Sequence, residues 1–303
     1  GYWISACLSN VSFALLLFSA LGYFFPAFGA GNNLLSIVCA SVFLWFLTAL
    51  VLRGVKEAAG INTIVTLAKL VPLGLFVLSI VLLGKFNVDI FMDNFWGEPA
   101  GPGFGEQVVS TMIALVWVFT GIEGAVVISG RAKYVRDVGR STALGFAAVF
   151  TLYLIISMLS LGIMPREEMA QLATPSMAGI LECAIGPVGA AIVNLGVILS
   201  LVGALLGYVI IASETPFEAA RQGSFPLAFA KTNKHDAPVV TVLVSSGITQ
   251  LFLIVSYVAA STYQFFYSCA VNTILVPYVC SAAYYMVIGW KNEHLDGPHA
   301  PSV

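Results

Sequence analysis

The sequence contains little charge. Only 9% of its 303 residues are Asp, Glu, Lys or Arg, whereas an ordinary soluble domain carries about 25%. The formal net charge is −2, so no face of the protein can supply the dense Lys and Arg that bind nucleic-acid phosphates. We therefore exclude nucleic acid as a partner.

Patterns typical of catalysis and metal binding are also lacking. The chain has five cysteines and three histidines, and their spacing matches neither a CxxC motif nor a zinc site. No nucleophile–base set and no phosphate-binding glycine loop occurs. The sequence thus predicts no enzyme, no metal site and no cofactor. The cysteines fall mostly in apolar runs, where we expect small core residues.

The chain is instead rich in long apolar runs, with 59% hydrophobic residues and a mean hydropathy of +0.95. A helix needs about 20 apolar residues to cross roughly 30 Å of hydrocarbon, whereas β-barrel strands would be shorter and alternating. The sequence predicts an all-α integral membrane protein, a single transmembrane domain over residues 1–303. The predicted spans are approximately residues 2–25, 33–52, 61–84, 107–130, 141–164, 187–212, 239–260 and 264–290.

Basic residues alternate between the two sides of these spans. On one side only Lys85 and Arg166 occur. The other side carries ten basic residues: Arg53, Lys56, Arg131, Lys133, Arg136, Arg140, Arg221, Lys231, Lys234 and Lys291. Because cytoplasmic loops are enriched in Lys and Arg, we expect the N- and C-terminal ends of this chain to be cytoplasmic.

Two charged residues, Lys69 and Glu123, fall deep inside predicted spans. A charge near the centre of a span costs about 2.5–3.5 kcal/mol and usually has a function; the alternative is an interior contact that orients helices. Gly121 and Gly124 flank Ile122 and Glu123, and glycine weakens a helix. The glycines indicate either a broken helix of the kind that binds substrate in transporters or close helix packing.

Four stretches carry a family resemblance: GYWISACLSNVSFALLLFSALGYFFP, INTIVTLAKLVPL, WVFTGIEGA with its following basic loop, and LLGYVIIASETPFEAARQGSFP. Together they resemble the arginine/ornithine antiporters, in the basic amino acid/polyamine antiporter branch of the amino acid–polyamine–organocation superfamily. The resemblance implies a LeuT-like fold of two inverted five-helix repeats, in which the eight spans correspond to family helices three to ten. The first two and the last two helices of the family would be missing. The first family helix is a broken helix that holds part of the substrate in the family. We therefore do not expect residues 1–303 alone to transport.

The resemblance also implies site residues. Trp117 would close over the substrate beside the helix break, and Tyr208 would line the site. The positions in contact with substrate would be Ala6, Asn10, Trp117, Thr120, Gly121, Ile122 and Tyr208.

A cytoplasm-side gate would comprise Tyr2, Glu123 and Tyr278. Lys69 resembles a lysine whose ammonium occupies the ion site of sodium-coupled relatives, which implies sodium-independent exchange. The alternative for Lys69 is a side chain that extends to the cytoplasmic surface.

These features lead us to expect an antiporter in a bacterial inner membrane that exchanges arginine for ornithine by alternating access. Its partners would be small amino acid substrates and the lipid bilayer. The sequence leaves the choice between a monomer and a homodimer open. A proton-coupled amino acid permease or symporter, with Glu123 or Lys69 titrating, is the main alternative. A channel or a membrane scaffold subunit is a more distant one.

Overall fold

The computed structural model describes residues 1–54, 70–96, 103–121, 135–172, 174–259 and 262–291. Regular structure in these ranges is helical. They contain no β-strand, and an isolated bridge joins Thr232 to Pro238. The prediction of an all-α protein is confirmed.

Six helices in the described ranges are long and apolar enough to cross a membrane. They lie at the positions of six predicted spans: α1 (Tyr2–Gly22), α2 (Leu34–Arg53), α7 (Val135–Leu161), α10 (Pro187–Arg221), α11 (Val239–Val258) and α12 (Tyr263–Lys291). The other two predicted spans coincide in part with shorter helices, at Leu70–Leu82 and in α5 (Phe104–Phe119). Residues 61–69 and 122–130 of those two spans lie outside the described residues.

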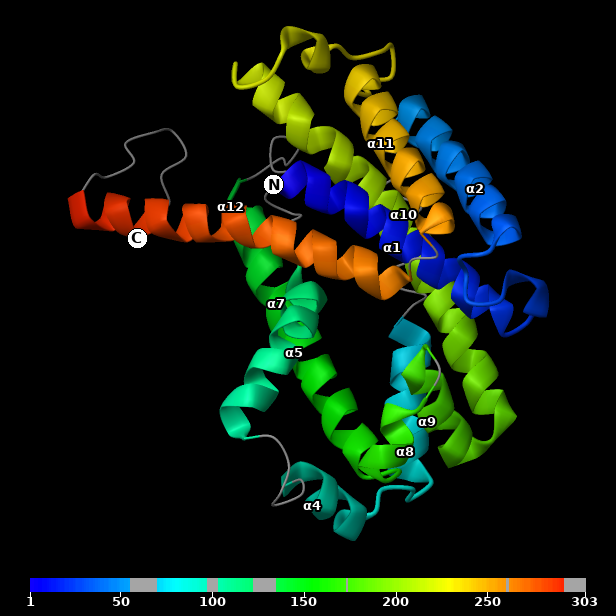
Figure 1. Ribbon diagram of the computed structural model, residues 1–303. Coiled ribbons are helices and arrows are strands. Elements are labelled where there is room, and N and C mark those ends of the chain that lie inside the picture. Colours follow the sequence, from blue (N-terminus) through cyan, green and yellow to red (C-terminus); the bar gives the residue numbers. More distant parts are fainter. Residues whose placement is uncertain (55–69, 97–102, 122–134, 173, 260–261, 292–303) are drawn as a thin grey trace.

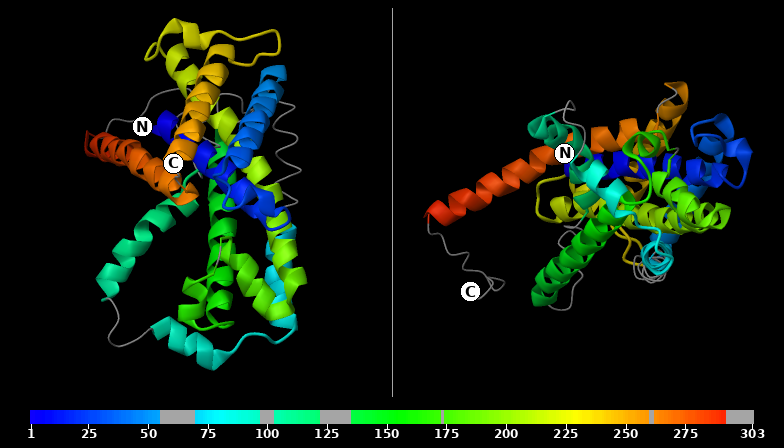
Figure 2. Two further views of the ribbon diagram at one scale, coloured as in Figure 1. Left: turned by 45° about the vertical axis from the view of Figure 1, so that its right-hand side comes forward. Right: turned by 90° about the horizontal axis from the view of Figure 1, so that it is seen from below.

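Helix α1 forms the centre of the bundle (Figure 1). It packs against α10, α12 and α11, while α2 lies beside α11 and also contacts α1 and α10. Its side chains Val11 and Leu15 are fully buried in the main apolar core. Figure 2 shows α7 and α5 extending away from this core toward the end of the molecule where α4 (Val88–Trp96) lies.

Serine hydroxyls of α1 hold α12 in place. Ser5 Oγ donates to the Ala270 carbonyl at 2.8 Å, and Ser12 Oγ donates to the Tyr263 carbonyl at 3.0 Å. Because lipid supplies no hydrophobic drive for helices to associate, close packing and interhelical hydrogen bonds hold such bundles together. The polar residues of α1 therefore contribute to assembly even though the helix is apolar overall.

Three short helices lie in loops that the sequence analysis predicts on the side with few basic residues. They are α4, α8 (Arg166–Ala170) and α9 (Ser176–Ile185). Figure 1 shows all three at the same end of the molecule. The opposite end carries the loop after α10, with the short 3-10 helix η3 (Leu227–Ala230).

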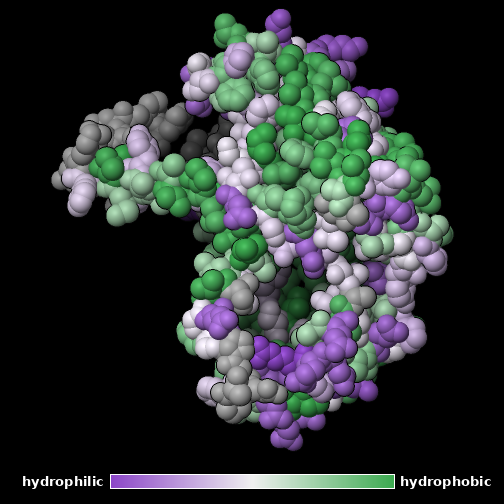
Figure 3. Space-filling view, in the orientation of Figure 1, coloured by the Kyte–Doolittle hydropathy of each residue, from purple (hydrophilic) through white to green (hydrophobic). Residues whose placement is uncertain are grey.

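The distribution of side-chain polarity fits a membrane setting (Figure 3). Hydrophobic side chains cover much of α2 and α11, while hydrophilic ones gather at the end that carries α4, α8 and α9. Large apolar side chains on the bundle surface, such as Val42, Phe46 and Leu251, are exposed. A soluble protein rarely exposes extended apolar patches, so these surfaces suit lipid.

Two sequence expectations were wrong in detail. The span predicted to end near residue 212 continues through Pro216 to Arg221 as one helix. The cysteines are not all core residues, because Cys7 is buried whereas Cys183 and Cys280 are exposed.

Close packing at Gly196 of α10 can be tested. A Cβ added there would collide with the ring of Pro72, and overpacking costs about 1–3 kcal/mol. We expect Gly196→Ala to lower the thermal unfolding temperature of the purified protein in detergent. The matched control is Gly145→Ala in α7, where a Cβ meets nothing within 4 Å; it should leave that temperature unchanged or raise it. Equal losses for both variants would contradict the packing.

Candidate functional site

Helix α5 stops inside the predicted span. It ends at Phe119, after which Thr120 takes an extended conformation with φ −64° and ψ 130°. Gly121 follows with φ +103°. The helix thus ends where the glycine pattern allowed a break, and the chain beyond Gly121 lies outside the described residues.

Gly121 occupies a position that only glycine fits. Its φ lies in the left-handed region, which is costly for residues with a Cβ. A Cβ added there would also lie 2.8 Å from the hydroxyl oxygen of Tyr208. The backbone conformation and the limited space therefore both favour a residue without a side chain at this position.

Tyr208 of α10 caps the end of α5. Its hydroxyl donates a hydrogen bond to the Thr120 carbonyl at 3.3 Å. The Thr120 N–H and Oγ1 both donate to the Val116 carbonyl, at 2.9 and 2.8 Å. Because an unpaired backbone group in hydrocarbon costs several kcal/mol, the phenol helps to stabilise a helix end at membrane depth.

An aromatic cluster surrounds this helix end. Phe13 of α1 contacts Trp117, with ring centroids 5.3 Å apart, and also Tyr208, at 5.1 Å. Trp117 further contacts Tyr267 of α12 at 5.5 Å. The structure therefore brings the predicted pair Trp117 and Tyr208 together through Phe13. The sequence analysis missed Phe13 and Tyr267, which differ in no local feature from the many other aromatic residues in the spans.

The α1 wall of the site contains a buried amide. Asn10 is 1% exposed, and its Oδ1 has no hydrogen-bond partner in the described structure. Ala6, one turn earlier, packs in a small cluster with Tyr208. Ala6, Asn10 and Phe13 follow helical spacing on one face of α1. An unsatisfied buried acceptor costs about 1–3 kcal/mol, so Asn10 Oδ1 offers a place for a donor from a ligand.

The proposed gate is described in part. A Cβ added to Gly1 would lie 2.8 Å from Cδ of Pro277, so the residue before Tyr2 lies against the α12 residue before Tyr278. Tyr278 lines a cavity of about 250 Å³ with Phe119 and Val116 of α5. Tyr278 is thus close to the end of α5. Glu123, Ile122 and Lys69 lie outside the described residues.

Glu214 is a buried carboxylate that the sequence analysis overlooked. It follows the predicted span 187–212, but it lies within α10 and is 1% exposed. The segment ETPFEAAR contains good helix formers after its proline, and this was the signal that the helix continues. The described part of the bundle therefore contains a buried carboxylate, Glu214, that the sequence analysis did not predict.

Comparison with known proteins identifies relatives. The amino acid permease family model matches residues 1–302. The chain is 43% identical over 302 residues to the arginine/ornithine antiporter of Pseudomonas aeruginosa, covering 97% of this chain and 62% of that protein. It is 41% identical over 299 residues to a putative arginine/ornithine antiporter of Escherichia coli, covering 97% and 65%. It is 38% identical over 301 residues to the arginine/ornithine antiporter of Latilactobacillus sakei, covering 98% and 63%.

Apolar helices packed around a helix that ends inside a predicted span fit a multi-pass membrane protein with the architecture of a secondary transporter. The chain belongs to the amino acid permease family of the amino acid–polyamine–organocation superfamily. Its helices are consistent with the LeuT-like plan of that superfamily, so the resemblance is confirmed at family level. The chain spans 62–65% of the length of these three relatives.

The contact between Gly121 and Tyr208 is open to a double-mutant cycle. Gly121→Ala introduces backbone strain and a clash with the hydroxyl, whereas Tyr208→Phe removes the hydroxyl and leaves the Thr120 carbonyl unpaired. Because the clash disappears when both changes are made, we expect the double variant to lose less stability than the sum of the single losses, by about 0.5–3 kcal/mol. Unfolding in detergent, followed by tryptophan fluorescence, measures this; strictly additive losses would exclude the contact.

Proposed function

We propose that the protein takes part in the exchange of cationic amino acids, arginine for ornithine, across a bacterial plasma membrane by alternating access. One observation carries the proposal: α5 ends beside an aromatic cluster, and the face of α1 that carries Phe13 of this cluster also carries the buried, unpaired amide oxygen of Asn10. The names of the three relatives support the choice of substrates.

The chemistry of the site suits a cation. The last carbonyls of α5 carry the partial negative charge of a helix C-terminus, and they point toward the break after Phe119. A guanidinium over the rings of Trp117 or Tyr208 gains about 0.5–2 kcal/mol. A guanidinium also has five N–H donors, one of which can reach Asn10 Oδ1. The substrate is held by dipoles and ring faces, so exchange requires no covalent step.

Alternating access follows from the position of the substrate site between several helices. Substrate bound at the break touches α1, α5, α10 and α12 together, so it changes the balance between states that open to either side. Tyr2 and Tyr278 are proposed to close the cytoplasmic path together with Glu123. Lys69 is proposed to replace a coupling ion, which makes exchange independent of sodium.

The orientation and assembly complete the proposal. The loop with η3 faces the cytoplasm and the end with α4, α8 and α9 faces outward, as the basic residues indicate. Residues 1–303 form one transmembrane unit. A homodimer is compatible with this arrangement and forms no part of the mechanism.

Counterflow in proteoliposomes tests the proposed function. We expect the full-length protein to take up labelled arginine when ornithine is inside, with or without sodium. Trp117→Ala should reduce the initial rate by about tenfold or more, since it removes the ring beside the break and its cation contact. Trp290→Ala is the matched control, because that tryptophan is 92% exposed at the far end of α12, and its rate should be unchanged.

The same assay separates the alternatives. Uptake that needs no internal amino acid but follows a proton gradient would replace exchange with a proton-coupled permease. Flux that does not saturate with arginine would indicate a channel. Either result contradicts the antiport proposal.

A further inference from the structure

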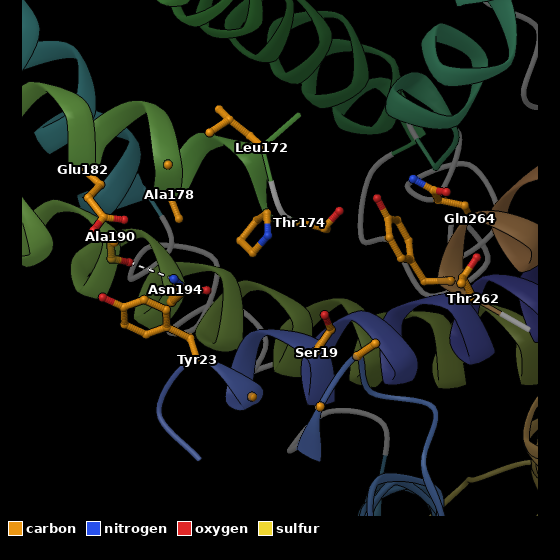
Figure 4. A pocket seen from close by; sticks show the side chains of 16 residues that line it. Ser19, Tyr23, Leu172, Thr174, Ala178, Glu182, Ala190, Asn194, Thr262 and Gln264 are labelled. Carbon is orange, nitrogen blue, oxygen red and sulfur yellow. Dashed lines mark hydrogen bonds between the residues drawn. The ribbon is translucent and has the colours of Figure 1, made fainter. Parts of the chain in front are cut away.

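A second cavity, of about 600 Å³, lies apart from the helix break. It is enclosed by the end of α1, by α9, by the first turns of α10 and by the start of α12. Figure 4 shows Glu182, Ala190, Asn194 and Tyr23 at one end of it, with Thr262 and Gln264 at the other. α9 belongs to the end of the molecule that the proposed orientation places outside.

The charge on the described lining of the cavity is negative. Glu182 of α9 is the one carboxylate among its described lining residues, and no Lys or Arg is among them. Within the described parts of the chain, no cation forms an ion pair with Glu182. The cavity therefore favours a positively charged guest.

A buried amide adds a second, independent sign of a ligand. Asn194 of α10 lines the cavity and is 2% exposed. Its Nδ2 donates to the Ala190 carbonyl at 2.9 Å, which fixes the orientation of the amide. Its Oδ1 has no hydrogen-bond partner in the described structure. Buried acceptors normally have partners, so this oxygen is available to a donor from a ligand.

A run of aromatic rings connects the cavity with the helix break. Tyr263 lines the cavity and contacts Tyr267, with centroids 6.0 Å apart. Tyr267 contacts Trp117 at 5.5 Å, and Trp117 contacts Phe13 at 5.3 Å. Ring faces attract organic cations, so the two places are joined by surfaces that a guanidinium or ammonium group can follow.

From these features we infer that the cavity is an outer subsite for cationic amino acids. The cationic side chain binds at Glu182 and Asn194 before the substrate passes along the rings to the central site. The inference rests on the proposed exchange function and adds a specific role for Glu182. An uncharged analogue such as citrulline gains nothing from the carboxylate, so the subsite selects for charge before the central site is reached.

Transport kinetics measured separately from the external and the internal side of the membrane test the subsite. In proteoliposomes with the full-length protein in one known orientation, Glu182→Gln should raise the external KM for arginine by about fivefold, the upper end for an exposed ion pair. Its kcat and its internal KM should stay unchanged, and the inhibition constant of external citrulline should not move. Glu182→Asp, which keeps the charge, should restore most of the affinity.

Two further variants make the outcome decisive. Glu168→Gln removes a carboxylate from α8 at the same end of the molecule but outside the cavity, and it should leave KM unchanged; an equal rise in KM would assign the effect to general surface charge and overturn the subsite. Asn194→Ser should raise the external KM in the same direction as Glu182→Gln. A rise on the internal side, or on both sides, would also overturn the inference.

Failure of the proposed function can be told apart from failure of the subsite. If the unsubstituted protein shows no exchange, the proposed function fails, and equilibrium binding of labelled arginine to the detergent-solubilised protein then tests the cavity alone. In the Trp117→Ala background, which weakens the central site, residual arginine binding should be lost on adding Glu182→Gln. Residual arginine binding that is the same with and without Glu182→Gln would exclude the subsite.

Discussion

The need to satisfy every backbone polar group in the absence of water governs this structure. A continuous helix meets that need by itself, but α5 does not continue past Phe119. The Tyr208 hydroxyl compensates by donating to the Thr120 carbonyl, and Gly121 leaves the space for that hydroxyl. The break can exist at membrane depth only because a neighbouring helix supplies a hydrogen bond. The aromatic cluster and the proposed substrate position both depend on it.

Helix α1 supplies the fixed wall against which the break is built. Its serines bond to carbonyls of α12, and its centre is fully buried. The same helix presents Asn10 and Phe13 to the break and ends beside the outer cavity. One helix thus connects the two places where unpaired amide oxygens occur. In the proposed mechanism, the cation moves between these two places along rings of α12 and α5.

Much of the fold could be anticipated from local features. Six predicted spans lie where long apolar helices occur, because twenty apolar residues leave the chain few alternatives in lipid. The end of α10 was misjudged, because the buried position of Glu214 beyond the predicted span depends on neighbouring helices. Trp117 and Tyr208 were expected together from family resemblance, but nothing in the sequence singled out Phe13 as the ring between them.

The sequence by itself determined the membrane class and the approximate spans, and it indicated the glycines at 121 and 124 as one place where a helix could end. These depend on composition, run length and glycine position, all of which act within a few residues. Only the tertiary structure decided that Tyr208 reaches Thr120, 88 positions earlier in the chain, and that Asn194 faces a cavity beside Glu182. Such contacts join segments far apart in the chain, and the packing of whole helices, rather than any local preference, brings them together.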